Sequence, residues 1–359
     1  MHETRLPLNP PFPEEYNDFL MAVRLKDIAR DLGVSVVTVS KVLRNHTDIS
    51  EETRERVLKR MKELNYRPNL AARALVTGRS CTMGLVVPDL VHPFFSHVAK
   101  GVSKALRRKG YSLFISSSEE DPQLEQQEIE QMLARRVDAL IIASAQWTVE
   151  SFRRIEEQQV PFVLIDRQFP GFAANFIGVD DIAVGRMATD HLFDQGCRRI
   201  AHIRGPEVSP ALGRLEGYRG SLAKRGLSPA PGHVVLSRTG DDAGDVSGYE
   251  AMLKLLSLSP RPDGVFCYND PTALGAMKAI LDSGLRVPED IAVVGCGNVI
   301  YDTLLRVPLT SVDQDSLSIG EKAGKLALAL VESKTPQRPK SILLEPNLVV
   351  RASSQRRGL

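Results

Sequence analysis

Residues 34–44, VSVVTVSKVLR, combine apolar, hydroxyl and basic side chains at the spacing of one short helix. The buried stripe of this helix is predicted to consist of Val39, Val42 and Leu43. The side chains predicted on or near the opposite face are Val36, Val37, Ser40, Lys41 and Arg44. In a DNA major groove, apolar side chains contact thymine methyl groups, and Lys or Arg reaches guanine edges or phosphates. The pattern therefore favours contact of this face with DNA.

An alternative places Val36 and Val37 in the interior, where they would help to close the core of a small helical module. Such a module has few core positions to spare. Valine is a mediocre helix former, so an adjacent pair at a helix start is better explained by a contact than by helix propensity. The residues alone leave both interpretations open.

The helix that carries these residues is predicted to be the second of three. The first would run from about Lys26 to Leu32 and end at Gly33, because glycine readily adopts the left-handed conformation common at helix ends. Ser35 would cap the second helix. A helix, a tight turn with glycine and a capped second helix follow the order of a helix-turn-helix.

A third helix is predicted to start near Ser50, a good capping residue. Val57, Met61 and Leu64 recur at helical spacing and would form the third wall of the module's core. The basic residues of this helix are expected mostly on its solvated face. They are Arg54, Arg56, Lys59, Arg60 and Lys62.

Positive charge is concentrated on the same module. The chain of 359 residues has a net charge of only +2, yet residues 22–80 carry 13 Lys and Arg against 7 Asp and Glu. A basic module of this kind neutralises phosphates and releases counterions, so we expect an affinity for DNA that falls steeply with salt. The length predicts two or three domains, and a hydrophobic content of 43% is ample for buried cores.

Other classes of protein find little support in the sequence. The four cysteines are far apart without metal-ligand spacing, so we expect no metal, no cofactor and a reduced protein of the cytoplasm. No apolar run approaches a membrane span, and the N-terminus lacks the pattern of a signal peptide. Residues 1–21 contain four prolines without periodicity, which indicates a disordered extension and a translation start at Met21. The absence of nucleotide-binding, metalloprotease and serine-hydrolase motifs argues against an enzyme, including an NAD-dependent oxidoreductase.

From Met83 onward, short apolar runs alternate with helical patterns, which predicts an α/β fold with parallel sheets and helices on both faces. Two series of similar length are present, and the second is predicted to begin at residues 175–179, NFIGV. Two series imply two α/β subdomains that face a cleft. Ligands of open parallel sheets bind beyond the carboxyl ends of the strands.

Aromatic and polar side chains follow several of these predicted strands. Phe94 and Phe95 would form an aromatic wall. The polar set comprises Asp166, Arg167, Arg214, Asn269 and Asp270. Together they suit a small hydroxylated molecule. Structural roles would also explain single residues, because Arg214 could pair with Asp166 and Asp270 could cap the following helix.

Several motifs occur together in the chain, from about Val23 to Arg351: LKDIARDLGVS, TVSKVL, EETRERV, LNYRPNLAARAL, GLVVPDL, FCYNDPTALGAMKAI and GLRVPEDIAVVG. They resemble the lactose-repressor/galactose-repressor (LacI/GalR) family of bacterial transcription regulators. The resemblance implies a three-helix DNA-binding module, a hinge helix and a two-subdomain core similar to periplasmic sugar-binding proteins. It also implies a homodimer that binds a pseudo-palindromic operator under the control of a small-molecule effector, with a sugar as the first expectation.

By this resemblance, Val36 and Val37 set the operator preference, and such an apolar pair is uncommon there. Residues 69–75 would form a hinge helix in the minor groove, with Leu75 inserted between base pairs. Alternatively, this segment is an ordinary linker whose Leu75 packs on the following domain. The candidate DNA contacts are Val36, Val37, Thr38, Ser40, Lys41, Arg44, Asn69, Ala72, Arg73 and Leu75.

The resemblance also places effector contacts in the core, at Phe95, Asp166, Arg214, Asn269 and Gln314. The whole candidate effector set is Phe94, Phe95, Asp166, Arg167, Arg214, Asn269, Asp270 and Gln314. Two positions depart from the family. Gly297 stands where sugar-responsive and purine-responsive members often have an acid, and Val208 where purine-responsive members have arginine. A purine effector is therefore disfavoured.

Two alternatives remain for the function. A regulator that has lost effector sensing would fit Gly297. A solute-binding receptor would share the core but would need an export signal and no helix-turn-helix. The organisation expected is an extension over 1–21, a helix-turn-helix domain over 22–65, a hinge and linker over 66–80, an effector-binding and dimerisation core over 81–351 and a tail over 352–359.

Overall fold

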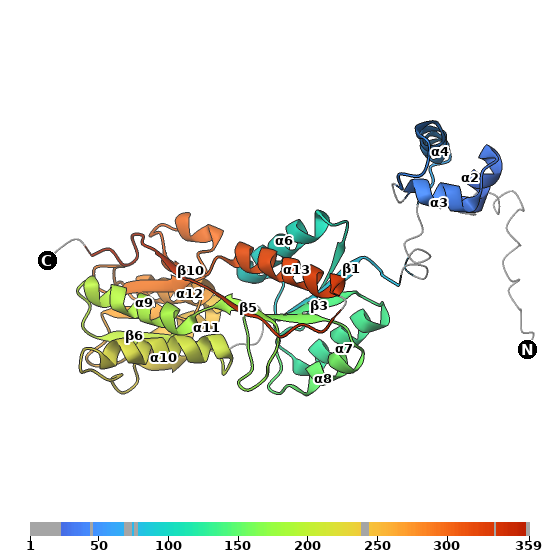
Figure 1. Ribbon diagram of the computed structural model, residues 1–359. Helices are drawn as coiled ribbons and strands as arrows, with labels where there is room; N and C mark the ends of the chain where they lie inside the picture. Colours follow the sequence, from blue (N-terminus) through green and yellow to red (C-terminus); the bar gives the residue numbers. More distant parts are fainter. Residues whose placement is uncertain are drawn as a thin grey trace, which may run out of the picture. The chain divides into compact units, whose positions relative to one another are not determined.

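The computed structural model describes residues 23–43, 46–67, 74, 78–237, 244–333 and 335–356. The chain forms two compact units, one up to Gly78 and one from Arg79 onward. Figure 1 shows a small helical module and a larger core of helices and sheets. The extension expected over residues 1–21 lies outside the described residues, as does most of the expected hinge helix.

The small module has the three helices and the caps that the sequence predicts. The helices are α2 (Leu25–Leu32), α3 (Val36–Leu43) and α4 (Glu51–Glu63). Gly33 ends α2 with a φ of 67°, in the left-handed region. The Ser35 hydroxyl accepts the Thr38 amide at 3.0 Å, and the Ser50 hydroxyl accepts the Thr53 amide at 3.3 Å. These bonds satisfy amides that a helix start leaves unpaired.

Two details of this module differ from expectation. Leu43 was predicted in the buried stripe of α3 but is exposed, since the module's core reaches only Val39 and Val42 on this short helix. The basic residues of α4 lie mostly on its exposed face, as predicted, but two of the five are half-buried. Arg60 pairs with Asp31 at 2.6 Å, and Arg54 donates to the backbone carbonyl of His46 at 2.6 Å. Part of the basic face of α4 therefore ties the module together.

The first subdomain of the core is a sheet between two layers of helices. In the described part of the chain its strand order is β11-β5-β4-β3-β1-β2, and every neighbouring pair is parallel. The strands are β1 (Thr82–Val87), β2 (Ser112–Ser117), β3 (Ala139–Ile142), β4 (Phe162–Ile165), β5 (Phe176–Val179) and β11 (Ser341–Leu344). The helices are α6 (Pro93–Arg107) and α13 (Ser316–Glu332) on one face, and α7 (Pro122–Ala134) and α8 (Glu150–Glu157) on the other.

The second subdomain repeats this three-layer plan. Its described strand order is β12-β10-β9-β8-β6-β7, parallel except for the antiparallel pair of β10 and β12. The strands are β6 (Ile200–Arg204), β7 (Val234–Leu236), β8 (Gly264–Cys267), β9 (Ala292–Cys296), β10 (Thr310–Asp313) and β12 (Asn347–Val349). The helices are α9 (Asp181–Asp194) and α10 (Ser209–Ala223) on one face, and α11 (Gly244–Leu256) and α12 (Asp270–Asp282) on the other, with the short 3-10 helix η1 (Ile300–Thr303) after β9.

The boundary between the subdomains differs from the prediction. The run at 175–179, predicted to open the second series, is β5 and pairs with β4 and β11 in the first sheet. Within the described residues the chain crosses between the subdomains three times, from β5 to α9, from β10 to α13 and from β11 to β12. Alternation of strands and helices predicts the layers, but it carries no information about which sheet a strand joins.

The C-terminal segment also differs from expectation. Ser353 and Ser354, predicted in a tail, are fully buried, and the Ser353 hydroxyl donates to the Val293 carbonyl at 2.7 Å. The helix α10 begins at Ser209, because Pro210 is tolerated in the first turn. In the described residues no helix has the length and apolarity needed to cross a bilayer.

The crossing of α6 and α13 supplies a stability test. A Cβ atom on Gly320 would lie 2.1 Å from the carbonyl oxygen of Val98, so the two backbones are in contact there. We expect Gly320→Ala to lower the free energy of unfolding by about 1–3 kcal/mol, measured by urea denaturation. The control is Gly220→Ala on the exposed face of α10, where nothing lies within 4 Å of the added methyl group. That variant should match or exceed the wild type, and an unchanged Gly320→Ala protein would contradict the packing.

Candidate functional site

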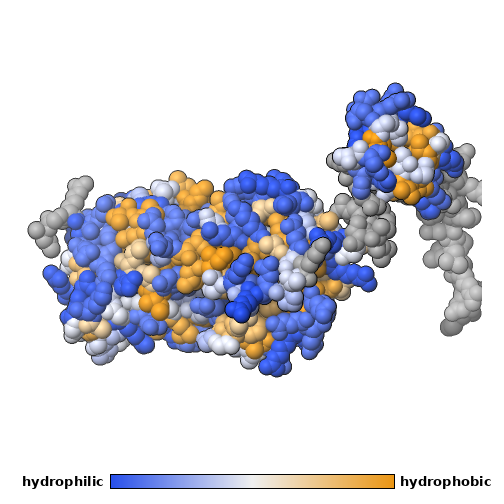
Figure 2. Space-filling model, in the orientation of Figure 1, coloured by the Kyte–Doolittle hydropathy of each residue, from blue (hydrophilic) through white to orange (hydrophobic). Residues whose placement is uncertain are grey.

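The exposed face of α3 is the first candidate site. Val36 is 45% exposed and Val37 is 63% exposed, so neither closes the module's core as the alternative required. Figure 2 shows apolar surface on this module among hydrophilic residues. Two neighbouring valines open to solvent at the start of a helix have no packing role in the module. The arrangement provides methyl groups for an external partner.

The structure describes some of the other candidate DNA contacts and not the rest. Thr38 and Ser40 are half-buried on α3, and Thr38 also lies within 2.9 Å of the Ser35 hydroxyl. The Lys41 ammonium forms an ion pair with Asp48, in the turn that follows α3. The remaining candidates lie outside the described residues; they are Arg44, Asn69, Ala72, Arg73 and Leu75.

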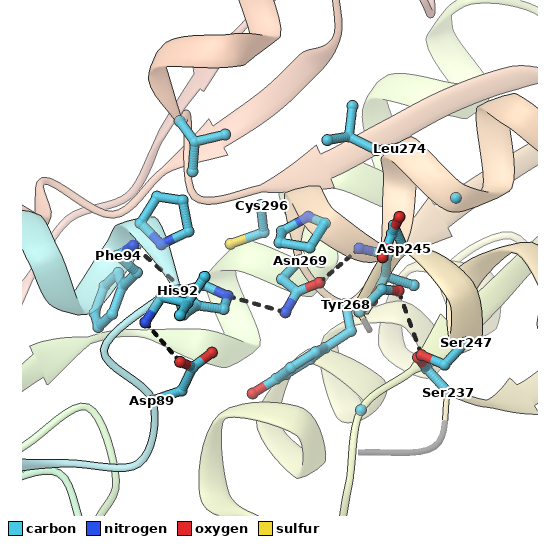
Figure 3. A pocket seen from close by; sticks show the side chains of 18 of the residues that line it. Asp89, His92, Phe94, Ser237, Asp245, Ser247, Tyr268, Asn269, Leu274 and Cys296 are labelled. Carbon is cyan, nitrogen blue, oxygen red and sulfur yellow. Dashed lines mark hydrogen bonds between the residues drawn. The ribbon is translucent and has the colours of Figure 1, made fainter. Parts of the chain in front are cut away.

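The second candidate site is a cavity of about 800 Å³ between the two subdomains of the core. Its walls come from the loops after β1, β2 and β4 of the first sheet and after β6, β8 and β9 of the second. Seven of the eight candidate effector residues line it: Phe94, Phe95, Asp166, Arg167, Arg214, Asn269 and Gln314. Figure 3 shows aromatic and polar side chains directed toward one another across this space.

Arg214 is a buried cation held by its own subdomain. It is 3% exposed; its Nε donates to Asp181 at 2.9 Å and its Nη1 donates to the carbonyl of Tyr268 at 2.7 Å. The guanidinium also lies 4.8 Å from the centre of the Tyr268 ring. The structural alternative named Asp166 as its ion-pair partner, but the observed partner is Asp181. Burial raises the pKa of Asp181 to about 6, against the opposing effect of Arg214.

Arg167 is compensated in the same way within the first subdomain. Its two terminal nitrogens donate to the two carboxylate oxygens of Glu120 at 2.8 and 2.6 Å. It also donates to the carbonyl of Ser144 at 3.1 Å. The bidentate pair fixes the guanidinium plane. Glu120, which lines the cavity after β2, was missed because the sequence carries no sign of this long-range pairing.

Asp166 lacks the hydrogen-bonded partner that each of the two arginines has, so its carboxylate is available to a ligand. Its backbone has a φ of 60°, which turns the chain sharply after β4. The side chain is 10% exposed and lies 3.8 Å from the Nε of Arg167, and among the described residues none donates a hydrogen bond to it. Burial raises its pKa, while Arg167 and Arg214 act in the opposite direction. Asp166 is therefore a buried acceptor that faces the cavity.

One hydrogen bond joins the two walls of the cavity. The Nδ2 of Asn269 donates to the Nε2 of His92 at 3.2 Å, and the Oδ1 of Asn269 caps α12 by accepting the Thr272 amide at 2.9 Å (Figure 3). Burial lowers the pKa of His92 to about 4, so the ring is neutral near neutral pH. His92 was missed because a lone histidine after a strand gives no specific signal.

Asp270 does not line the cavity, unlike the other candidate effector residues. It is fully buried behind β9, where it accepts the Ser311 hydroxyl at 2.7 Å and the Val299 amide at 3.1 Å. A Cβ atom on Gly297, whose φ is 136°, would lie 2.9 Å from Oδ2 of Asp270. The departure at Gly297 thus accommodates Asp270. Asp270 also does not cap α12 through its side chain, since Asn269 does.

The described residues offer no group of His, Cys, Asp and Glu side chains arranged to hold a metal ion. What the cavity does offer is hydrogen bonding and aromatic contact. Carboxylate and amide groups accept and donate hydrogen bonds, and Phe94, Phe95 and Tyr268 supply flat apolar surface. This combination binds small hydroxylated molecules.

Comparison with known families gives two matches. Residues 24–69 match the family described as bacterial regulatory proteins, lacI family. Residues 189–354 match the periplasmic binding protein-like domain. The first match covers the helix-turn-helix, and the second covers most of the second subdomain together with α13.

Three proteins illustrate the similarity over the whole chain. The HTH-type transcriptional regulator GalR of Escherichia coli K12 is 36% identical over 330 residues, which are 92% of this chain and 95% of that protein. The structure of a lac repressor dimer bound to operator and an anti-inducer has a TM-score of 0.83 at 28% identity and covers 94% of this chain and 100% of that one. A complex of the transcriptional regulator CelR with cellobiose has a TM-score of 0.70 at 32% identity and covers 92% and 99% of the two chains.

Asp302 gives the second subdomain a pH dependence that can be measured. It is fully buried in η1; burial, followed by the charge of Asp270, raises its pKa to about 8. The unfolded chain loses this proton more easily, so stability should fall as the pH rises from about 4 towards 8. In urea denaturation, the free energy of unfolding of Asp302→Asn should decline less over this pH range than that of the wild type, by about 1 kcal/mol or more.

The control for this experiment is Asp282→Asn. Asp282 is exposed and its pKa is lowered by the hydrogen bond from Lys278, so its removal should leave the decline between those pH values in place. The same pH profile in Asp302→Asn and the wild type would contradict the assignment of the proton to Asp302.

Proposed function

Because the chain belongs to the lacI family of bacterial regulatory proteins, we propose that it is a sequence-specific transcription regulator, a repressor whose DNA affinity is set by a small-molecule effector. The observation that carries this proposal is one chain that joins an exposed, apolar recognition helix to a core with a polar cavity. The protein acts by binding, not by catalysis, and works in the cytoplasm, where DNA and small metabolites are both present.

DNA is read by α3 in the major groove. Val36 and Val37 contact thymine methyl groups, while Thr38, Ser40, Lys41 and Arg44 contact phosphates or base edges. The hinge residues Asn69, Ala72, Arg73 and Leu75 enter the minor groove, with Leu75 as the wedge. This assignment of the hinge rests on the sequence resemblance.

The regulator binds DNA as a homodimer on a pseudo-palindromic site. The lac repressor structure that resembles this chain is a dimer bound to operator. The core exposes large apolar side chains on both subdomains, among them Phe114 and Ile115 on β2 and Leu304 after η1. Exposed apolar patches mark interaction surfaces, and two-fold symmetry would cover the same patch on both copies. Figure 2 shows such apolar patches on one face of the core.

The effector is an uncharged hydroxylated molecule of the sugar type. Each cation among the described lining residues already has a carboxylate partner: Arg167 has Glu120, Arg214 has Asp181 and Lys278 has Asp282. Further carboxylates line the cavity, namely Asp89, Glu119, Asp166 and Asp245. Hydroxyl groups donate to these acceptors, whereas an anionic ligand would be repelled by them. The related CelR structure holds cellobiose, a neutral sugar.

Effector binding is coupled to DNA through the crossings between subdomains. A ligand held by Asp166 and Phe95 on one side and by Arg214 and Asn269 on the other favours the closed cleft. Closure changes the angle between the subdomains and therefore the packing of the first subdomains across the dimer. The coupling requires unequal affinity of the effector for the two states.

The helix-turn-helix and the cavity also bear on the two alternative functions. A solute-binding receptor has no use for a helix-turn-helix, which this chain has. A regulator without effector sensing would have a cavity that binds no ligand.

A salt titration tests the DNA assignment. The full chain should bind a short labelled duplex of random sequence at low salt, and the logarithm of its affinity should fall linearly with that of the salt concentration, with a slope of several units. Val37→Asp, at a position 63% exposed, should weaken binding at least about tenfold without unfolding the module. Leu227→Asp, an exposed position of the core, is the control and should bind like the wild type. A slope near zero would refute DNA binding.

A ligand panel tests the effector class. Galactose, ribose and cellobiose represent neutral sugars, with galacturonate and phosphorylated ribose as anionic counterparts. At least one neutral sugar should raise the melting temperature of the core, and the anions should not, because the described cations of the cavity are already paired. A shift with the anions alone would contradict the charge argument, and no shift with any ligand would favour a regulator without effector sensing.

A further inference from the structure

An ion pair between Lys41 and Asp48 lies at the end of the recognition helix. Lys41 is the one charged side chain of α3, all eight residues of which the structure describes. Its ammonium is bound by the carboxylate of Asp48, in the turn between α3 and α4. The hydrogen bond from Lys41 lowers the pKa of Asp48, so the carboxylate stays ionised near neutral pH. The only cation of the recognition helix is thus neutralised before DNA arrives.

This pair is not needed to hold the module together. Both side chains are well exposed, 39% for Lys41 and 54% for Asp48, and exposed ion pairs contribute little to stability. The turn between α3 and α4 is already fixed by the bond of Arg54 to the His46 carbonyl and by the Ser50 cap. A carboxylate beside a DNA-binding face is therefore better explained by its effect on binding than by its effect on folding.

Non-cognate and cognate DNA would respond differently to this carboxylate. Non-specific complexes depend on contacts between cations and phosphates, and losing one such contact lowers their affinity and reduces the salt slope by about one. A cognate site adds base contacts, here those of Val36 and Val37, and these do not involve Lys41. On a cognate site the base contacts hold the protein on the DNA. Lys41 can then leave Asp48 and contact a phosphate.

We propose that Asp48 is a specificity-determining residue that withholds Lys41 from the phosphates of non-cognate DNA. This inference rests on the proposed DNA-binding function. Selectivity then comes from two sources. The base-reading side chains favour cognate DNA, and the competing carboxylate of Asp48 disfavours non-cognate DNA.

The test compares Asp48→Asn with a variant that has the same change of charge elsewhere. Glu63→Gln, at the end of α4, also removes an exposed carboxylate from an ion pair with an arginine, Arg60, at 3.1 Å. Fluorescence anisotropy with a short duplex of random sequence is measured over a range of salt concentrations. Asp48→Asn should bind several-fold more tightly than the wild type, and its salt slope should be steeper by about one. Glu63→Gln should have the slope of the wild type.

A double-mutant cycle separates release of Lys41 from simple loss of repulsion. In the background Lys41→Met, the change Asp48→Asn should no longer alter the salt slope, because the cation it would release is gone. Helical circular dichroism and the melting temperature of each variant establish that the module is folded.

Three results would overturn the inference alone: Asp48→Asn behaves like Glu63→Gln, it weakens binding, or its full effect persists without Lys41. A wild-type chain that does not bind random DNA at low salt would instead overturn the proposed function, and the inference with it.

Discussion

Three short crossings between the two sheets are the constraint on which the rest of the core depends. Asp180 alone separates β5 from α9, and two residues each separate β10 from α13 and β11 from β12. Connections this short hold the carboxyl edges of the sheets against one cavity, while their few backbone dihedrals still permit a change of angle. Gln314 lies in one crossing and also lines the cavity, so a ligand contact acts on the crossing directly.

The buried cations that line this cavity are compensated by carboxylates of the protein. Arg214 and Arg167 are buried, and each is paired within its own subdomain, which offsets the cost of burying a cation. Asp166 lies beside Arg167 as a buried carboxylate that lines the cavity. Behind the cavity, Asp270 occupies the space that a side chain at position 297 would need, so the missing acid at Gly297 reflects packing as well as ligand choice. The cavity therefore offers hydrogen-bond acceptors and aromatic surface to a ligand.

The sequence was most informative where structure is local. The caps at Ser35 and Ser50 and the turn at Gly33 depend on neighbours within three residues, and all are found as predicted. Strand membership is non-local, so β5 was assigned to the wrong subdomain. Seven predicted cavity residues follow strands or match family positions, whereas Glu120 and His92 act through partners more than forty residues away. Asp270 was wrongly predicted to line the cavity. It adjoins Asn269 at the start of α12, but only Asn269 faces the cavity.

We propose that occupancy of the core cavity sets the affinity of the helix-turn-helix for DNA. The most direct measurement is the affinity of the full chain for a duplex selected from a random library, with and without a sugar that calorimetry shows to bind the core. We expect the affinity to change by about 5-fold to 150-fold, the range typical of allosteric coupling. An affinity for the selected duplex that is the same with the cavity filled and empty would contradict the proposal.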